Sequence, residues 1–123
     1  MLDAIGHVAL VVRNPSRTAA LFEKLFAAKI VRRTDLEGHD ETFVRLGRTW
    51  FVLVQADVER PRTGDHIAFH VMKATLQSTA EKLKEMNMEF QLPRSDSSLY
   101  FFDYNARRVR SKFSILIPVQ ENN

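Results

Sequence analysis

Apolar and polar positions follow one pattern twice along this chain. Residues 5–12 are β-branched and apolar, which is typical of a buried strand, and a polar turn and an amphipathic helical stretch follow them. The same order returns at residues 65–71, where Asp-His-Ile-Ala-Phe-His-Val repeats the Gly-His-Val-Ala-Leu-Val-Val of residues 6–12. Each copy has a histidine at its second position, His7 in one and His66 in the other. A repeat of this size indicates two similar modules.

The first module reads as β-α-β-β-β. Asn14 is a natural N-cap and Pro15 suits the first helical position, so a helix is expected over residues 16–26. A strand begins at Ile30, and residues 41–46 and 49–55 form two more strands around a turn at Gly47. The predicted apolar face of the helix consists of Ala19, Ala20, Phe22, Leu25 and Phe26.

The second module repeats that order. Its predicted elements are a strand at 66–71, a helix at 76–85 and strands at 89–92, 98–104 and 109–117. The residues expected to face inward from the helix are Leu76, Ala80, Leu83 and Met86. The fold class is therefore α+β, with tandem modules at 1–57 and 63–117 of a single domain, 1–123. If the modules curl into a curved mixed sheet around a cavity, strand alternation lets His7 and His66 face the same concave space.

Composition limits the chemistry. The chain has 123 residues, enough for one domain, and no cysteine, so any metal must be held by histidine, carboxylate or water. No stretch approaches the length of a membrane span or reads as a secretory signal, so a cytoplasmic location and no membrane partner are expected. The two histidines in repeated positions favour metal ligands over the alternative, satisfied polar residues of the core. His39 is expected in an exposed loop, and His70 along the cavity.

The net charge of +3 comes from one short basic stretch. Without it the chain would be close to neutral. Neither aromatic residues interleaved for base stacking nor a helix-turn-helix pattern accompanies the stretch, so no nucleic-acid partner is expected. The basic residues are Arg107, Arg108, Arg110 and Lys112.

Three segments of the chain resemble the vicinal oxygen chelate superfamily, which includes glyoxalases, extradiol dioxygenases, bleomycin-binding proteins and fosfomycin-resistance enzymes. The likeness covers nearly the whole chain and is nearest to the epoxide-hydrolase branch of the fosfomycin-resistance metalloenzymes. It rests on Ile5-x-His7, on Arg-Thr-Gly-Asp-His-Ile-Ala-Phe at 62–69, and on Ser-Leu-Tyr-Phe-Phe-Asp at 98–103. The resemblance implies a homodimer that pairs modules across the subunit boundary and binds a divalent metal, manganese, through two histidines and a glutamate.

The resemblance also implies roles for individual residues. His7 and His66 would be metal ligands, and Glu41, which precedes Trp50 by nine residues, matches the carboxylate base that activates water. The alternative for Glu41 is an ordinary solvated residue at the start of a strand. Residues expected to contact an anionic substrate are Trp50, Arg94, Ser98 and Tyr100. For Ser98 and Tyr100 the alternative is routine strand packing. The loop near Arg94 lacks the glycine-rich, arginine-bearing insertion of the hydrolase branch.

Two positions depart from the family. Ala9 replaces a hydroxyl residue, and Arg110 stands where the third ligand, a glutamate, belongs. Charges 4 Å apart near a surface interact by about 4 kcal/mol, so Arg110 cannot point at a cation in that register. One hypothesis is that the reading frame of the gene is shifted by one base from about Arg108 onward. For one choice of synonymous codons, the other frame encodes Val-Phe-Glu, and sequencing of the gene tests this hypothesis.

Two functions remain open on the sequence. One is an enzyme that opens the epoxide of a small phosphonate with water or a thiol and whose activity is impaired by the missing ligand. Glyoxalase-like or dioxygenase-like chemistry is an alternative within this class. The other is a non-catalytic member of the superfamily that binds a small molecule. His7 and His66 favour the first, whereas Ala9 and Arg110 favour the second.

Overall fold

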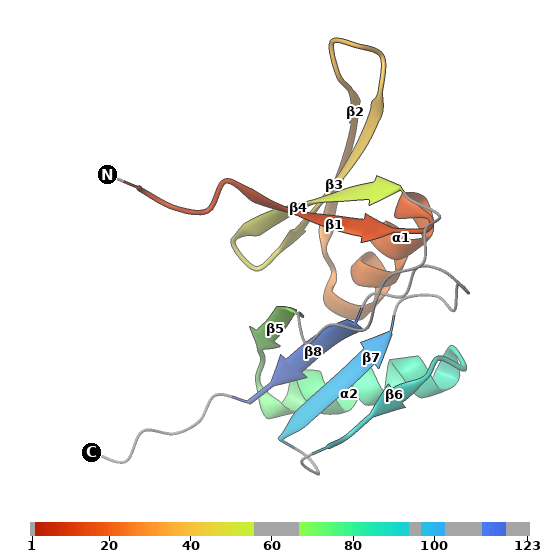
Figure 1. The fold of residues 1–123 in the computed structure, drawn as a ribbon. Helices are drawn as coiled ribbons and strands as arrows, with labels where there is room; N and C mark the ends of the chain where they lie inside the picture. Colours follow the sequence, from red (N-terminus) through yellow and green to blue (C-terminus); the bar gives the residue numbers. More distant parts are fainter. Residues whose placement is uncertain (1, 56–66, 94–96, 103–111, 118–123) are drawn as a thin grey trace. The chain divides into compact units, whose positions relative to one another are not determined.

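The structure, a computed structural model, describes residues 2–55, 67–93, 97–102 and 112–117. Its elements run β1-α1-β2-β3-β4 and then β5-α2-β6-β7-β8, so the two predicted β-α-β-β-β modules are confirmed. The chain divides near residue 60 into two compact units, each with one mixed sheet and one helix (Figure 1). Neither helix in the described part is long and apolar enough to cross a membrane.

The first unit is a four-stranded mixed sheet. Its strands are β1 (His7–Val12), β2 (Lys29–Thr34), β3 (Asp40–Leu46) and β4 (Thr49–Gln55). They lie in the order β1-β4-β3-β2, with β1 parallel to β4 and the other pairs antiparallel. The turn between β3 and β4 is the predicted one, and Gly47 there has a φ of +61°, which a residue without Cβ adopts at no steric cost.

Helix α1 (Pro15–Phe26) begins where the sequence predicts. The Asn14 side chain accepts a hydrogen bond from the Arg17 N–H at 3.1 Å, and Pro15 occupies the first turn, where no amide donor is needed. The helix ends at Ala27, which has a left-handed φ of +53° and donates its N–H to the Glu23 carbonyl. Capping at both ends therefore fixes the length of α1.

Helix α1 packs against one face of this sheet. Phe22 and Val44 are fully buried between them, together with Val12 at the end of β1. The predicted apolar face is right for Ala19, Phe22 and Leu25. It is wrong for Ala20, which is exposed, because the helix is rotated so that Thr18 and Leu21 complete the buried stripe.

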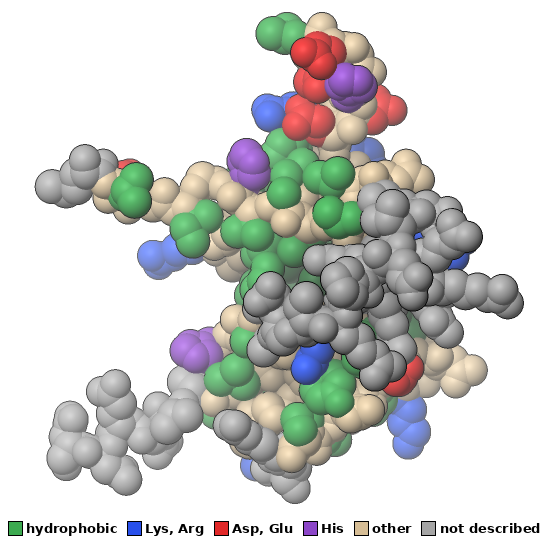
Figure 2. All heavy atoms as spheres, in the orientation of Figure 1, with side chains coloured by type: hydrophobic (Ala, Val, Ile, Leu, Met, Phe, Trp, Pro, Cys, Tyr) green, Lys and Arg blue, Asp and Glu red, His purple; other side chains and the backbone are tan. Residues whose placement is uncertain are grey.

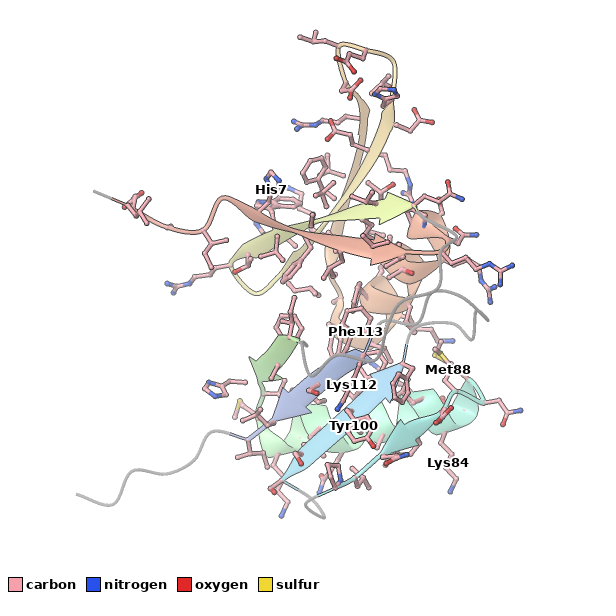
Figure 3. The ribbon with its side chains drawn as sticks, viewed as in Figure 1. His7, Lys84, Met88, Tyr100, Lys112 and Phe113 are labelled. Carbon is pink, nitrogen blue, oxygen red and sulfur yellow. The ribbon has the colours of Figure 1, made fainter. Side chains whose placement is uncertain are left out.

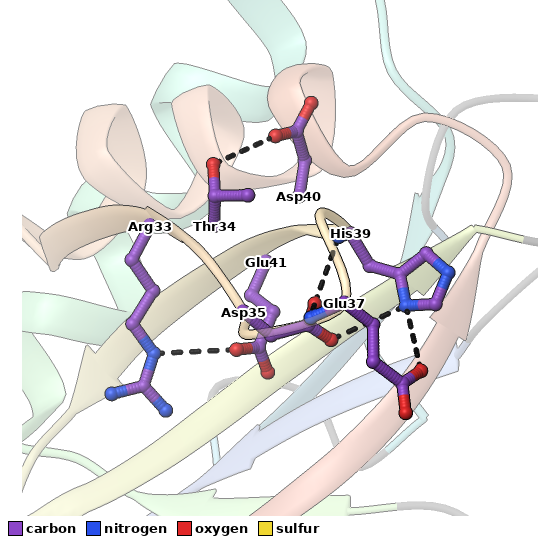
Figure 4. Close-up of polar contacts among 7 residues, drawn as sticks. All are labelled: Arg33, Thr34, Asp35, Glu37, His39, Asp40 and Glu41. Carbon is purple, nitrogen blue, oxygen red and sulfur yellow. Dashed lines mark hydrogen bonds and ion pairs between the residues drawn. The ribbon is translucent and has the colours of Figure 1, made fainter.

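The β2–β3 hairpin ends in an acidic turn. The Asp35 Oδ1 accepts hydrogen bonds from the N–H groups of Glu37 at 2.9 Å and His39 at 2.8 Å, and the His39 ring contacts the Asp35 and Glu37 carboxylates (Figure 4). Acidic side chains gather around a histidine at this tip (Figure 2). His39 is exposed, as predicted, and its contacts serve the turn.

The second unit has the same architecture. Its strands are β5 (Ile67–His70), β6 (Phe90–Gln91), β7 (Ser98–Phe102) and β8 (Lys112–Leu116), in the order β5-β8-β7-β6. Strand β5 is parallel to β8, and the other pairs are antiparallel. The predicted ends 103–104 and 109–111 of the last two strands lie outside the described residues.

Helix α2 (Lys73–Glu85) covers one face of the second sheet. It begins three residues before the predicted start. Within the helix, the Thr79 hydroxyl donates a hydrogen bond to the Thr75 carbonyl at 2.8 Å. Leu76 and Leu83 are buried as predicted, whereas Ala80 and Met86 are only half-buried. The core beneath the helix is completed by Leu99, Phe101, Phe113 and Ile115.

Candidate functional site

The face of the first sheet that α1 leaves uncovered carries three of the predicted site residues. In the ladder, His7 lies opposite Trp50, and strand alternation puts Glu41 on the same face because Thr42 and Val44 point toward α1. His7 projects from the start of β1 on this face (Figure 3). The structure therefore brings the predicted ligand His7, the predicted base Glu41 and Trp50 to one surface.

An aromatic ring links the predicted ligand to the predicted base. The Phe43 ring meets the His7 imidazole edge to face, with 6.1 Å between centroids, and the Arg33 guanidinium carbon lies 4.6 Å from the centroid of the same Phe43 ring. Arg33 Nε donates to Glu41 Oε1 at 3.3 Å (Figure 4). The side chains thus form a continuous row from His7 through Phe43 and Arg33 to Glu41.

The Arg33 contact bears directly on the predicted role of Glu41. The guanidinium contacts one carboxylate oxygen, Oε1, so the other oxygen, Oε2, takes no part in this pair and could accept a proton from water. The pair is exposed, since 63% of the Arg33 side chain is accessible, and exposed ion pairs contribute at most about 1 kcal/mol. Separation of Glu41 from Arg33 therefore costs little free energy. The ion pair is compatible with a Glu41 carboxylate that leaves Arg33 and contacts water.

Sequence reasoning missed the cationic and aromatic members of this face. Besides Arg33 and Phe43, these include Arg45, whose guanidinium carbon lies 5.8 Å from the centroid of the Trp50 ring. The signal that would have found Phe43 and Arg45 is the alternation along 41–46, which places them on the same face as Glu41.

In the second unit, Ser98 and Tyr100 share the face away from α2. They alternate with Leu99 and Phe101, which are buried against the helix. The Tyr100 hydroxyl donates a hydrogen bond to the Gln91 amide oxygen. The Ser98 hydroxyl oxygen is buried and has no hydrogen-bond partner among the described residues. A Tyr100 contact to a substrate must therefore use the remaining acceptor capacity of the hydroxyl or displace Gln91.

Several predicted site residues fall outside the described part of the chain. These are His66, Arg94 and Arg110. Within the described residues, no three His, Asp or Glu side chains group as a metal site. His7 itself fits a metal: its imidazole is exposed, and neither ring nitrogen bonds to another described residue, so a ring nitrogen is available as a ligand.

The sequence matches one known family. The sequence profile of the Glyoxalase/Bleomycin resistance protein/Dioxygenase superfamily matches residues 4–103. The chain belongs to this superfamily.

Within that class, the chain is similar to fosfomycin resistance proteins named FosX. The protein of Mesorhizobium japonicum is 27% identical over 111 residues, covering 84% of this chain and 80% of the relative. The protein of Listeria innocua is 25% identical over 113 residues, covering 85% of each.

A solved structure shows the same fold. It is a variant of FosX from Listeria monocytogenes in complex with Mn(II) and a dihydroxypropylphosphonic acid, with a TM-score of 0.78 and 23% identity over 97% of this chain and 95% of that one. The likeness confirms the predicted α+β fold of tandem modules.

Proposed function

We propose that this chain is a metal-dependent enzyme that opens the epoxide of a small phosphonate, such as fosfomycin, by adding water. The observation that supports the proposal most directly is the shared open face of His7, Glu41 and Trp50 on the first sheet. The relatives named FosX, and the Mn(II) in one FosX structure, support the substrate class and the choice of manganese.

In the proposed reaction, Glu41 removes a proton from water while the water oxygen bonds to an epoxide carbon. The carbon–oxygen bond of the ring breaks, and the proton ends on the ring oxygen, so the product is a vicinal diol. A divalent ion held by His7 and His66 would polarise the epoxide oxygen as a Lewis acid. Ser98, Tyr100, Arg94 and Trp50 would contact the rest of the substrate. We also propose that Arg110, in place of a carboxylate ligand, lowers the metal affinity.

The Arg33–Glu41 ion pair supports a second candidate function, a non-catalytic protein that binds a small anionic molecule. In such a protein Arg33 and Glu41 would stay paired and Glu41 would have no catalytic role. Ala9 and Arg110 point the same way, since a hydroxyl and a ligand are both missing from the positions that the family uses.

The assembly that we propose is a cytoplasmic homodimer in which each chain is a single domain of two modules, 1–57 and 63–117. Its partner is the small-molecule substrate, with neither nucleic acid nor membrane. Sedimentation equilibrium of the purified protein tests the dimer, and a monomeric mass at working concentration would contradict it.

The experiment that tests the activity follows ³¹P NMR spectra of fosfomycin with purified protein and Mn(II). The expected result is conversion to the diol, with Glu41→Gln retaining metal and losing about 10² to 10⁴ of the rate, the usual contribution of a general base. His7→Ala is expected to lose metal in atomic emission analysis. Glu37→Gln, which removes an exposed carboxylate from the neighbouring turn, is the matched control and should behave as wild type.

A wild-type protein that binds metal and opens no epoxide would favour the non-catalytic function. If the wild type binds no stoichiometric metal and opens no epoxide, and Arg110→Glu restores neither property, the enzyme function is wrong.

A further inference from the structure

Lys112 lies on the face of the second sheet opposite α2, and the sequence alone assigned this lysine only to a basic stretch. We propose that its ammonium group, with the hydroxyl side chains beside it on β7 and β8, forms a binding site for a small tetrahedral oxyanion that needs no metal. Phosphate and alkylphosphonates are the anions of this class. The inference rests on the proposed function only in naming a phosphonate as the physiological anion.

The position of the ammonium group is defined by aromatic contacts. Lys112 lies opposite Phe102 in the β7–β8 ladder. Its Nζ nevertheless lies 4.2 Å from the centroid of the Tyr100 ring, which belongs to the residue two positions before Phe102 on the same face of β7 (Figure 3). The Tyr100 and Phe102 rings meet edge to face with 5.7 Å between centroids. The lysine side chain therefore extends along the sheet across this aromatic pair instead of projecting straight into solvent.

No carboxylate neutralises this charge in the described part of the chain. The Lys112 ammonium group forms no ion pair with a described Asp or Glu side chain, and its described contact is with an aromatic ring. Lys112 is half-buried and its described partner is the face of the Tyr100 ring. A half-buried ammonium with only a ring for a partner can attract an anion, since a cation–π contact leaves its hydrogen-bond donors available.

Hydroxyl groups lie in the direction in which Lys112 extends. Ser114 is directly opposite Tyr100 in the ladder, and Ser98 is the next residue of β7 on the same face. Neighbouring strands are about 4.8 Å apart, so one tetrahedral anion can contact groups from both. Hydroxyl donors beside an ammonium are a common setting for oxyanion recognition, in which the ammonium serves as a point charge.

Ser98 provides a second, independent observation at this place. Its hydroxyl oxygen is buried without a partner, whereas nearly all buried polar atoms in proteins are hydrogen-bonded. A bound anion, reached by a small shift of the atoms that cover Ser98, would supply the missing acceptor.

The test measures binding of inorganic phosphate and of methylphosphonate to the full chain in the presence of EDTA, by titration followed in ¹H–¹⁵N NMR spectra. We expect saturable shifts at the amides of Ser98, Tyr100, Lys112 and Ser114. Lys112→Met keeps the apolar stem of the side chain and removes the charge, and it should weaken binding by about tenfold or more. Lys112→Arg should retain binding, because the charge and its contact with the Tyr100 ring persist.

Lys84→Met is the matched control. Lys84 is an exposed lysine on α2, which packs on the other face of the sheet, and its replacement makes the same charge change. Wild-type affinity for this variant would support a local site, and equal weakening by both variants would overturn the proposal in favour of a general effect of net charge. Absence of saturable shifts in the wild type, or an unchanged affinity in Lys112→Met, would also overturn it.

Failure of this inference is distinguishable from failure of the proposed function. A protein that binds phosphate through Lys112 in EDTA but opens no epoxide with Mn(II) supports the anion site and contradicts the enzyme. Epoxide opening with a KM for fosfomycin that Lys112→Met leaves unchanged contradicts the anion site alone.

Discussion

At the scale of single residues, the buried Ser98 hydroxyl is the least satisfied group in the described structure. Its oxygen is closed to solvent and has no hydrogen-bond partner. Such a group costs about 1 to 3 kcal/mol, because its hydration is lost and nothing replaces it. A residue that costs stability and lies on the face expected to bind substrate is better explained by ligand binding than by packing.

We expect Ser98→Ala to separate these two roles. Removal of the hydroxyl should leave the free energy of unfolding unchanged or raise it by about 1 kcal/mol, since an unsatisfied group disappears and the cavity is small. The same change should weaken methylphosphonate binding. Urea denaturation and NMR titration measure the two effects. A loss of stability of more than about 1 kcal/mol would mean that the hydroxyl has a hydrogen-bond partner in the folded protein.

The positions of site residues were predictable, but their contacts were not. Period-two alternation was enough to place Ser98 and Tyr100 on one face, because each side chain of a strand points opposite to its neighbours. It could not show that Tyr100 donates to Gln91 or that Arg33 pairs with Glu41, since both contacts join different strands and depend on register.

At the scale of elements, the turn between β2 and β3 depends on one carboxylate. Asp35 accepts N–H bonds from His39 and Glu37, and the bond from His39 is the largest cause that lowers the pKa of Asp35 below its ordinary value of 3.8. The folded state therefore holds this proton less tightly than the unfolded chain does. Asp35 contributes stability above the unfolded pKa, and this contribution is lost as the pH falls through the lower, folded value.

We expect Asp35→Ala to destabilise the protein at pH 7, and we expect the difference from wild type to narrow as the pH is lowered below about 3.8. Thermal or urea unfolding at a series of pH values measures this difference. Asp40→Ala is the matched control, because it removes an acidic residue from the same hairpin. In the described part of the chain, the Asp40 carboxylate accepts one hydrogen bond, from the Thr34 hydroxyl at 3.2 Å. If the difference in unfolding stability between Asp35→Ala and wild type is independent of pH, the expectation is wrong.

The ends of elements were predicted best where a side chain specifies them. Asn14 and Pro15 fixed the start of α1 within one residue, because a cap and a missing donor act locally. Helix α2 has no side-chain cap, since Met72 occupies that place, and its predicted start was three residues late. The exposed position of Ala20 was missed because the rotation of α1 depends on the sheet beneath it.

At the scale of the whole molecule, the repeat predicted the architecture. Two runs of similar pattern led to two β-α-β-β-β modules, and the order of strands in both sheets is the same, with the first strand of each module parallel to the last. Strand β8 lies beyond residue 103, where the match to the superfamily profile ends, and its Phe113 and Ile115 are buried in the core of their unit. Strand β8 therefore contributes to the core of its unit, whatever the effect of Arg110 on the proposed metal site.

We expect that the region around Arg110 lacks a metal ligand although the strand that follows it, β8, is kept. Arg110→Glu replaces a cation by a carboxylate at the position that we propose for a third metal ligand. We expect this variant to bind Mn(II) stoichiometrically and to unfold at a higher temperature when Mn(II) is added. A ligand present at a hundred times its Kd stabilises the folded state by about 2.7 kcal/mol. Atomic emission and thermal unfolding with and without Mn(II) measure both effects. Arg107→Glu makes the same charge change three residues away, so an equal response in both variants would show that net charge, and not a third ligand, controls metal binding.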